Sequence, residues 1–250
     1  MKAMDILRKN LYESRYTVAL CCSGLLAEAG RPSMRNQSRD YEIEKKYGHS
    51  SEEMFSAAYF STRPEKFFEF YKAEVLPRED MHPGKSYECL KVLEERNLIQ
   101  LIITNNACNF YSKVGCKNVL PLHGDVEDNI CTNCGKKFNA EYVAKSKGVP
   151  TCDVCGKLIR PKVVMFGEMV DNRLMTQAIN EITKADLLLV IGSDLGSPFA
   201  ERYVKYFEGK KLIIINPEGS YKDKVADLAI HRPIRDVLCE LEETCLAWRE

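Results

Sequence analysis

The sequence lacks an excess of charge of either sign, a long apolar run and an apolar leader. Its 250 residues carry 36 Lys and Arg against 36 Asp and Glu, whereas nucleic-acid-binding proteins usually have a basic excess. The longest apolar runs, at residues 187–191 and 212–215, fall far short of the ~20 residues that span a bilayer. Residues 1–16 contain no apolar segment of the kind that directs secretion. We therefore expect no nucleic-acid or membrane partner and a cytoplasmic location.

Cysteine is plentiful, but the odd number of eleven argues against a complete disulfide framework. Four of the cysteines cluster with the spacing of metal ligands. The others stand singly or as the Cys21–Cys22 pair, and in a reducing compartment they are expected to be free thiols that behave as small hydrophobic groups. With 45% hydrophobic and 29% charged residues, the chain is expected to form a packed core rather than a disordered one.

Four short apolar runs predict the strands of a parallel sheet. They are continuously apolar rather than alternating, as in strands buried on both faces, and they lie at residues 17–21, 98–104, 186–191 and 211–216. Helical patterns lie between them, at residues 64–75, 85–97, 172–184 and 198–208. Strands that alternate with helices predict a doubly wound α/β fold, in which ligands bind at the carboxyl ends of the strands.

Two stretches interrupt this alternation. Residues 31–75 are predicted to be largely helical and contain many aromatic residues, whereas residues 124–160 contain the clustered cysteines. Both are expected to be insertions that rise from the ligand-binding edge of the sheet.

The cysteine cluster is the most specific motif in the sequence. Cys131 and Cys134 are separated by two residues, and so are Cys152 and Cys155, with seventeen residues between the two pairs. This spacing is typical of a zinc site rather than of two chance pairs or a dithiol redox motif. Because four thiolates close the tetrahedron and leave no position for water, the predicted zinc is structural.

A histidine and a glycine-containing loop are further candidates. His123 ends an apolar run and precedes a glycine, a position suited to a general base or to a hydrogen-bonded histidine at a strand end. After the first predicted strand, Gly24 and Gly30 are the only glycines of a loop in which a dinucleotide-binding protein needs more. By itself the loop does not indicate a nucleotide.

In their order along the chain these motifs resemble the sirtuins. The matching motifs are the first strand–helix turn with AEAGRPSMR (27–35), TNN (104–106), LHGD (122–125), the two cysteine pairs, RPKVVMFGE (160–168), GSDL (192–195) and INPE (215–218). Together they cover residues 17–240. The resemblance implies a Rossmann-type domain at residues 1–30, 76–123 and 161–250, a helical module at 31–75 and a zinc-binding module at 124–160.

The resemblance also implies an activity. Sirtuins are NAD-dependent protein-lysine deacylases that transfer the acyl group to ADP-ribose and release nicotinamide. The co-substrate would be NAD and the partner an acyl-lysine protein or peptide, which adds as a strand between the modules.

Site residues follow from the same resemblance. His123 matches the catalytic base, and Asn106 matches the asparagine of the nicotinamide loop. The cofactor-binding positions would be Cys22, Ser23, Gly24, Arg35, Thr104, Asn105, Asn106, Cys108, Gly192, Ser193, Asn216 and Glu218. Substrate binding would involve Val164, Phe166, Gly167 and Glu168. The metal ligands would be Cys131, Cys134, Cys152 and Cys155.

The nucleotide loops depart from the sirtuin pattern. Cys22 replaces a glycine, Leu26 replaces a serine, Cys108 replaces an aspartate, and Ser193-Asp194 replaces Thr-Ser. If two or three polar contacts of ~1.5–3 kcal/mol are lost, NAD binding weakens by about two to five orders of magnitude. Two alternatives therefore stay open: a relative that binds a nucleotide or peptide without turnover, and an enzyme that cleaves NAD or transfers ADP-ribose.

Overall fold

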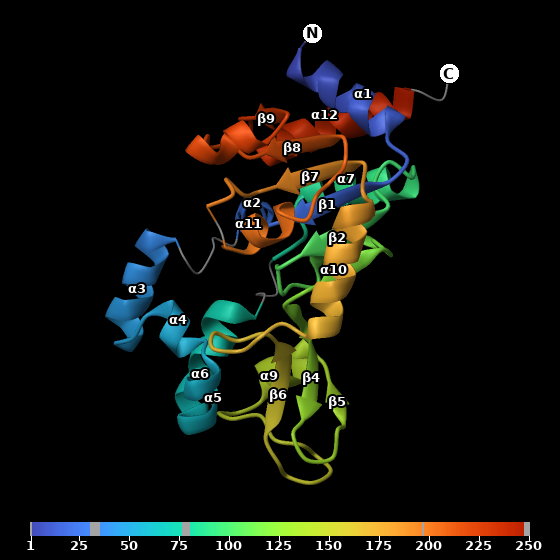
Figure 1. Cartoon of the computed structure of the whole chain (residues 1–250). Coiled ribbons are helices and arrows are strands. Elements are labelled where there is room, and N and C mark those ends of the chain that lie inside the picture. The colour runs from blue at the N-terminus through green and yellow to red at the C-terminus, as the bar shows by residue number, and fades with distance from the viewer. Residues whose placement is uncertain (1, 31–35, 77–80, 197, 248–250) are drawn as a thin grey trace.

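The computed structural model describes residues 2–30, 36–76, 81–196 and 198–247. Figure 1 shows a larger part, which contains both termini and a parallel sheet, and a smaller part below it, formed by the two insertions. Among the described residues no helix is long and apolar enough to cross a membrane.

The larger part is built on a six-stranded sheet, the first sheet, in which all neighbouring strands are parallel. The order is β3-β2-β1-β7-β8-β9. The strands are β1 (Thr17–Cys21), β2 (Leu101–Thr104), β3 (Val119–Pro121), β7 (Leu187–Ile191), β8 (Lys211–Ile215) and β9 (Leu228–Ile230). The doubly wound parallel sheet predicted from the continuous apolar runs is confirmed.

Helices bury both faces of the first sheet. Successive strand residues point to opposite faces, so that Ala19 and Cys21 pack into one core cluster and Val18 and Leu20 into another. The first face is covered by α1 (Ala3–Glu13), α2 (Ser23–Glu28), α7 (Lys85–Glu95), α8 (Phe110–Val114) and α12 (Ile234–Ala247). The second face is covered by α10 (Asn172–Lys184) and α11 (Pro198–Val204).

The predicted element bounds differ from the observed ones mainly at their ends. The strand predicted over 98–104 begins only at Leu101. Leu98 still belongs to the turn that follows α7, because its N–H bonds to the Leu93 carbonyl at 2.9 Å. The predicted helix 198–208 ends at Val204. Strands β3 and β9 have three residues each, too few to show a periodicity in sequence. Only the apolar run that ends at His123 indicated β3, and β9 was not predicted.

The smaller part contains a second sheet and the helical insertion. The second sheet is antiparallel, with the order β5-β4-β6 and strands β4 (Gly124–Cys131), β5 (Lys137–Phe138) and β6 (Ile159–Val163), and α9 (Ala140–Lys145) lies beside it. The insertion consists of α3 (Gln37–Tyr47), α4 (Ser51–Met54), α5 (Ala57–Thr62), α6 (Pro64–Phe70) and a π-helical turn at Tyr71–Val75. The helix predicted over 64–75 is thus an α-helix that widens in its last turn.

A single hydrophobic cluster, here called the aromatic core, joins the insertion to the second sheet. It contains Phe55, Phe67 and Tyr71 from the insertion together with Val126 and Ile159 from the sheet. Residues from both predicted modules therefore pack together, although they are far apart in the sequence. The module boundaries at residues 30/31, 75/76, 123/124 and 160/161 stay a prediction.

Candidate functional site

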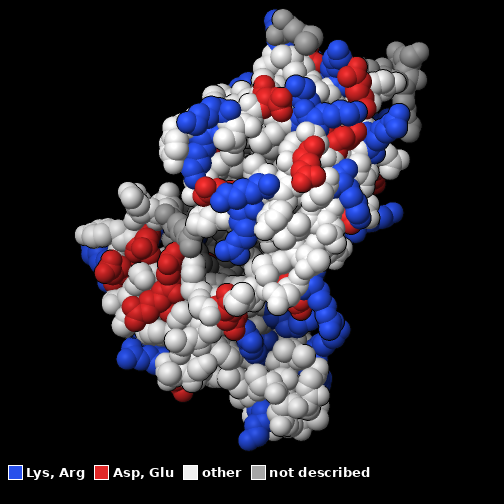
Figure 2. Space-filling view, viewed as in Figure 1, with Lys and Arg blue, Asp and Glu red and all other residues white. Residues whose placement is uncertain are grey.

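A cleft of about 750 Å³ opens at the carboxyl edge of the first sheet, where the insertion and the second sheet meet it. It is lined from four sides by α2, the loops after β2, β3 and β6, helix α11, and the insertion. In Figure 2 the surface is hollowed between the acidic side chains over α3 and α4 and the basic side chains over α11. Arg39 and Arg202 line the cleft, so an anionic ligand would be attracted to it.

His123 lies in the cleft as predicted from its position after a strand. It follows β3, and its carbonyl accepts the N–H of Val164 at 3.0 Å, which ties the histidine loop to the segment after β6. Its ring meets Phe199 edge to face, with centroids 5.7 Å apart. The following Gly124 has a φ of +75°, and a Cβ there would lie 2.0 Å from the carbonyl oxygen of Lys162. Only glycine can therefore carry the chain from His123 into β4.

Two asparagines from the loop after β2 also line the cleft. Asn106 donates its side-chain N–H to the Cys22 carbonyl at 2.9 Å and its backbone N–H to the Thr104 hydroxyl at 3.0 Å. Asn105 has a buried Oδ1 that accepts no hydrogen bond from any described residue. A buried acceptor without a donor is costly, and a ligand amide or hydroxyl in the cleft could supply the missing hydrogen bond.

The loop between β1 and α2 packs against the loop after β7 rather than standing open. The Gly24 N–H bonds to the Gly192 carbonyl at 3.0 Å, and a Cβ on Gly24 would lie 2.7 Å from the Gly192 Cα. Cys22, which precedes α2, is buried, and burial raises the pKa of its thiol to about 12. Cys22, which stands where the sirtuin pattern has a glycine, thus carries a neutral thiol that faces the protein interior.

The segment after β6 forms the opposite wall, with Val164, Phe166, Gly167 and Glu168 all lining the cleft. Phe166 forms a parallel bridge to Ser56 of the insertion: its N–H bonds to the Phe55 carbonyl and its carbonyl to the Ala57 N–H, both at 3.0 Å. The Glu168 carboxylate accepts from the Arg160 guanidinium at 2.5 Å and from the Met165 N–H at 3.0 Å. This carboxylate therefore holds the shape of the segment.

Other predicted cofactor-binding residues lie at the same edge of the sheet without lining the cleft. Thr104 is buried and donates to the Cys21 carbonyl at 2.9 Å. The Cys108 thiol lies 4.0 Å from the Tyr87 hydroxyl and is 4% exposed. The Ser193 hydroxyl accepts from the Leu195 N–H at 3.1 Å. Asn216 donates to the Glu218 carbonyl at 2.7 Å. Arg35 lies outside the described residues.

Several cleft residues were not predicted from the sequence. Phe199, Arg202 and Tyr203 come from α11, Arg39 from α3 and Met175 from α10. The start of α11 could have been suspected, because it follows the carboxyl end of β7. Arg39 and Met175 carry no local signal, since only the packing of the insertion and of α10 brings them to the cleft.

The four predicted metal ligands meet at one end of the second sheet. The sulfur atoms of Cys131, Cys134, Cys152 and Cys155 all lie within 4.8 Å of one another. Cys131 is 3.4 Å from Cys155, and Cys134 is 3.6 Å from Cys152. The Cys134 and Asn133 N–H groups point at the Cys131 sulfur, and the first of these contacts contributes most to lowering the pKa of its thiol to about 6. Four thiols in this arrangement, with two N–H groups aimed at one of the sulfur atoms, fit a structural zinc ion.

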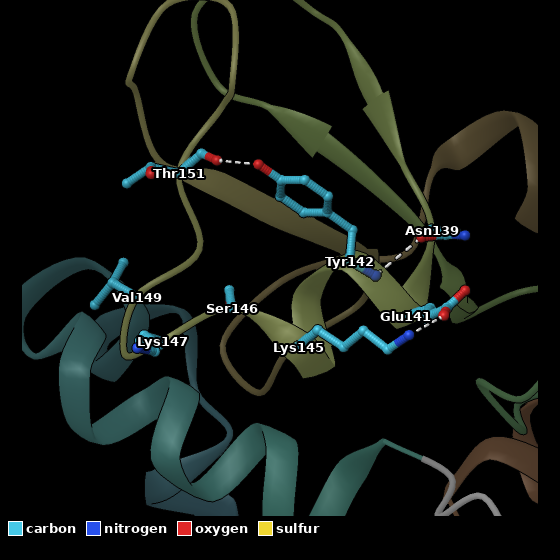
Figure 3. Close-up of a pocket in the computed structure, with 8 residues that line it drawn as sticks. All are labelled: Asn139, Glu141, Tyr142, Lys145, Ser146, Lys147, Val149 and Thr151. Atoms are coloured by element: carbon cyan, nitrogen blue, oxygen red, sulfur yellow. Dashed lines mark hydrogen bonds and ion pairs between the residues drawn. The ribbon is translucent and has the colours of Figure 1, made fainter.

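A second cavity, of about 490 Å³, lies on the zinc-binding side of the molecule, around α9 and the 146–151 loop (Figure 3). Several of its polar side chains take part in hydrogen bonds or ion pairs within the protein. Tyr142 donates its hydroxyl to the Thr151 carbonyl at 3.0 Å, and the Lys145 ammonium contacts Glu141 at 2.5 Å. None of the predicted catalytic, cofactor-binding or substrate-binding residues lines it, and the cleft remains the candidate functional site.

Fold and site together define an α/β protein with a Rossmann-type sheet, a four-cysteine cluster and a ligand cleft at the carboxyl edge of the sheet. Residues 22–197 match the model of the Sir2 family. The chain is 34% identical over 233 residues to a protein of Clostridium acetobutylicum named NAD-dependent protein deacetylase, which covers 93% of this chain and 95% of that one. It is 37% identical over 223 residues to a protein of the same name from Thermotoga maritima, covering 87% and 88%.

Solved structures agree with this assignment. One described as the structural basis of sirtuin substrate affinity superposes with a TM-score of 0.86 at 35% identity and covers 98% of this chain and 99% of that chain. Another, of Sir2 with a p53 peptide and NAD+, has a TM-score of 0.82 at 33% identity and covers 98% of both. This chain belongs to the Sir2 family.

Proposed function

We propose that the chain is an NAD-dependent protein-lysine deacylase that removes acetyl groups from lysine side chains. The acyl group would pass to ADP-ribose with release of nicotinamide. The observation that carries the proposal is that His123, Asn105, Asn106 and the 164–168 segment line one cleft in a chain of the Sir2 family. The relatives named NAD-dependent protein deacetylase support it.

In this proposal His123 is the general base. The acyl oxygen attacks C1′ of the nicotinamide ribose, nicotinamide leaves, and the imidazole takes a proton from a ribose hydroxyl. The edge-to-face contact with Phe199 and the bond from Val164 to the His123 carbonyl restrict where the ring can lie. A fixed ring matters because a base must be within hydrogen-bond reach of the proton it removes.

NAD would lie along the carboxyl edge of the first sheet. Asn105 and Asn106 would meet its nicotinamide end, and the unbonded Oδ1 of Asn105 supports this placement. The proposed contacts along the rest of the molecule are Cys22, Ser23, Gly24, Arg35, Thr104, Cys108, Gly192, Ser193, Asn216 and Glu218. The acyl-lysine peptide would add as a strand along Val164, Phe166, Gly167 and Glu168. Zinc would stay remote from the reaction, held by Cys131, Cys134, Cys152 and Cys155.

The test is the His123→Ala variant, assayed for nicotinamide release from NAD with an acetyl-lysine peptide. Loss of a general base lowers the rate by about 10²–10⁴-fold, while peptide binding should persist. His82→Ala is the matched control, because His82 is exposed and does not line the cleft. Equal rates for His123→Ala and the wild type would remove His123 from the mechanism. Nicotinamide release that does not need the peptide would favour NAD cleavage or ADP-ribosyl transfer instead.

One observation favours a second candidate, binding without turnover. The Cys108 thiol, where the sirtuin pattern has a carboxylate, is buried beside Tyr87 and offers the nicotinamide amide no charged acceptor. Calorimetry with NAD and with ADP-ribose separates the two candidates. If ADP-ribose binds and NAD binds no more tightly, and no nicotinamide is released with any acyl peptide, the chain is a binding protein.

A cytoplasmic location also remains part of the proposal. The ten cysteines with described side chains are all free thiols, which supports a reducing compartment.

A further inference from the structure

A second group of metal-ligand atoms lies away from both the cleft and the four-cysteine site. Cys89 is on α7, and Cys239 and Glu242 are three residues apart on α12. The Cys89 sulfur lies 3.6 Å from the Cys239 sulfur and 3.1 Å from the Glu242 Oε2. All three ligand atoms lie within 4.8 Å of one another. Residues that are 150 positions apart in the sequence thus converge on one point.

The four-cysteine site of the same molecule provides a scale for these distances. Its sulfur atoms are 3.4 Å apart in the Cys131–Cys155 pair and 3.6 Å apart in the Cys134–Cys152 pair. A tetrahedral zinc ion with Zn–S bonds of about 2.3 Å requires neighbouring sulfurs about 3.8 Å apart. The Cys89–Cys239 separation of 3.6 Å therefore needs almost no adjustment to hold the same ion.

Burial gives the group a rigid inner side and an open outer side. Cys89 is fully buried, and the neighbouring Leu90, Leu93, Val237 and Leu238 on the two helices belong to one hydrophobic cluster. Cys239 and Glu242 are only partly buried, so an ion can enter from solvent and keep one water as its fourth ligand. Burial and the hydrogen bond to Glu242 raise the pKa of the Cys89 thiol, and an ion that binds there displaces the thiol proton.

The charges around the group favour a cation. Two thiolates and one carboxylate would carry three negative charges. The Lys85 ammonium lies 3.1 Å from the Glu242 Oε2 but also 3.3 Å from a Glu88 carboxylate oxygen, so a divalent cation would offset two of the three charges. Three anions this close together would be unfavourable without the cation.

We propose that Cys89, Cys239 and Glu242 form a second zinc site, with three protein ligands and one water, that staples α7 to α12. Binding releases the two thiol protons to solvent and involves no oxidation. The ion stabilises the larger part of the molecule without taking part in the cleft chemistry.

The experiment counts zinc in the intact protein, kept reduced with a phosphine and equilibrated with micromolar free Zn²⁺. We expect two ions per wild-type chain and one in Cys239→Ser. Glu242→Gln should bind the second ion at least tenfold more weakly, since loss of even a residue that only orients a metal ligand costs about 10–100-fold in affinity, and Glu242 would be a direct ligand. At a hundredfold excess over Kd, zinc should raise the Tm of the wild type by about 5–10 °C.

Glu243→Gln and Cys116→Ser are the matched controls, because Glu243 is exposed on the same helix and Cys116 is a half-buried thiol elsewhere. Both should keep two ions. One ion per wild-type chain would overturn the proposal, and so would a second ion that persists in both Cys239→Ser and Glu242→Gln. Cys152→Ser should lose the other ion and keep this one, which distinguishes the two sites.

Discussion

The hydrophobic clusters around the first sheet and the aromatic core are built from different residues. Around the first sheet the core consists mainly of Leu, Ile and Val on parallel strands and the helices that cover them. The aromatic core is dominated by rings, with Phe67 within 5.1 to 6.0 Å of the ring centroids of Phe55, Phe60, Phe68 and Tyr71. It also contains two of the four clustered thiols, Cys131 and Cys152.

The aromatic rings and the clustered thiols explain how the smaller part can be stable although its helices and strands are short. Its elements are short: β5 has two residues, α4 has four and α9 has six. Helices and hairpins of this length are not stable alone. Large rings bury more area per residue than aliphatic side chains, and a metal ion adds folding free energy that the chain would otherwise have to obtain from a larger core. The first sheet needs neither.

Loss of the four-cysteine zinc should have the largest effect and should distinguish the aromatic core from the clusters around the first sheet. Structural zinc contributes about 10–16 kcal/mol in zinc-finger peptides, comparable with the whole stability of a domain of about 5–15 kcal/mol. In Cys152→Ser we expect the amides of β4 and β6 to lose protection in hydrogen exchange, whereas β1 and β7 keep theirs. Cys116→Ser serves as a control. Protection of β4 that survives Cys152→Ser would show that the rings alone hold the second sheet.

A ring deletion should come next. Phe67 is fully buried, and Phe67→Ala should cost about 3–5 kcal/mol, whereas Leu189→Ala in β7 should cost about 2–5 kcal/mol. The two variants should differ in where the loss appears. Hydrogen exchange should speed up only around the aromatic core in Phe67→Ala, but throughout the molecule in Leu189→Ala. The same pattern in both would mean that the molecule unfolds as one cooperative unit.

A smaller loss of stability is expected from a change at Lys72, which joins the insertion to the loop after α9. From the π-helical turn its ammonium donates to the carbonyls of Ser146 and Gly148, both at 2.6 Å, and to the Ser146 hydroxyl at 2.8 Å. Burial lowers the pKa of this lysine. The three acceptors hold its ammonium group between the π-helical turn and the 146–148 segment. Lys72→Met should cost about 1–3 kcal/mol in urea unfolding. Lys66→Met, at an exposed lysine that pairs with Glu69, should cost little. An equal loss in both variants would show that the hydrogen bonds of Lys72 to Ser146 and Gly148 do not stabilise the fold.

The smallest expected effect concerns pH. Asp227 accepts the Leu212 N–H at 2.8 Å and the Lys211 ammonium at 2.9 Å, and the N–H contact contributes most to holding its pKa below the usual value. The folded pKa is depressed, so the stabilisation is complete above the unfolded pKa of about 3.9 and is lost as the pH falls through the folded value. Because the side chain is partly exposed, Asp227→Asn should cost at most about 1 kcal/mol at pH 7.

The pH series also compares the two parts. The pKa of Asp40 in the insertion is lowered by the Ser51 hydroxyl and then by the Ser51 N–H, so Asp40→Asn should show the same dependence. Urea unfolding of both variants at pH 7 and pH 3 checks it. A deficit that stays constant between the two pH values would mean that the lost interaction is not that of the charged carboxylate.

The sequence was most informative where one short stretch decides the outcome. The runs at 18–21 and 187–191 are apolar at every position and predicted buried parallel strands in the observed places. The pairs Cys131/Cys134 and Cys152/Cys155 carry their own spacing, which predicted the convergence of the four thiols. Helices α1 and α12 were not predicted. An amphipathic pattern shows only that a helix is possible, and it does not show which face of the sheet the helix will cover.

The sequence by itself thus determined the fold class, the grouping of the four thiols and the strand-end position of His123, since each depends on residue type and local spacing. Only the tertiary structure decided that Gly24 must be glycine to pack against Gly192. The same holds for the hydrogen bonds of the Glu168 carboxylate to Arg160 and Met165, and for the contact between Cys89 and Cys239. Those contacts join segments whose separation in sequence carries no periodic signal, and they form only when the sheet and its helices have set the distances between them.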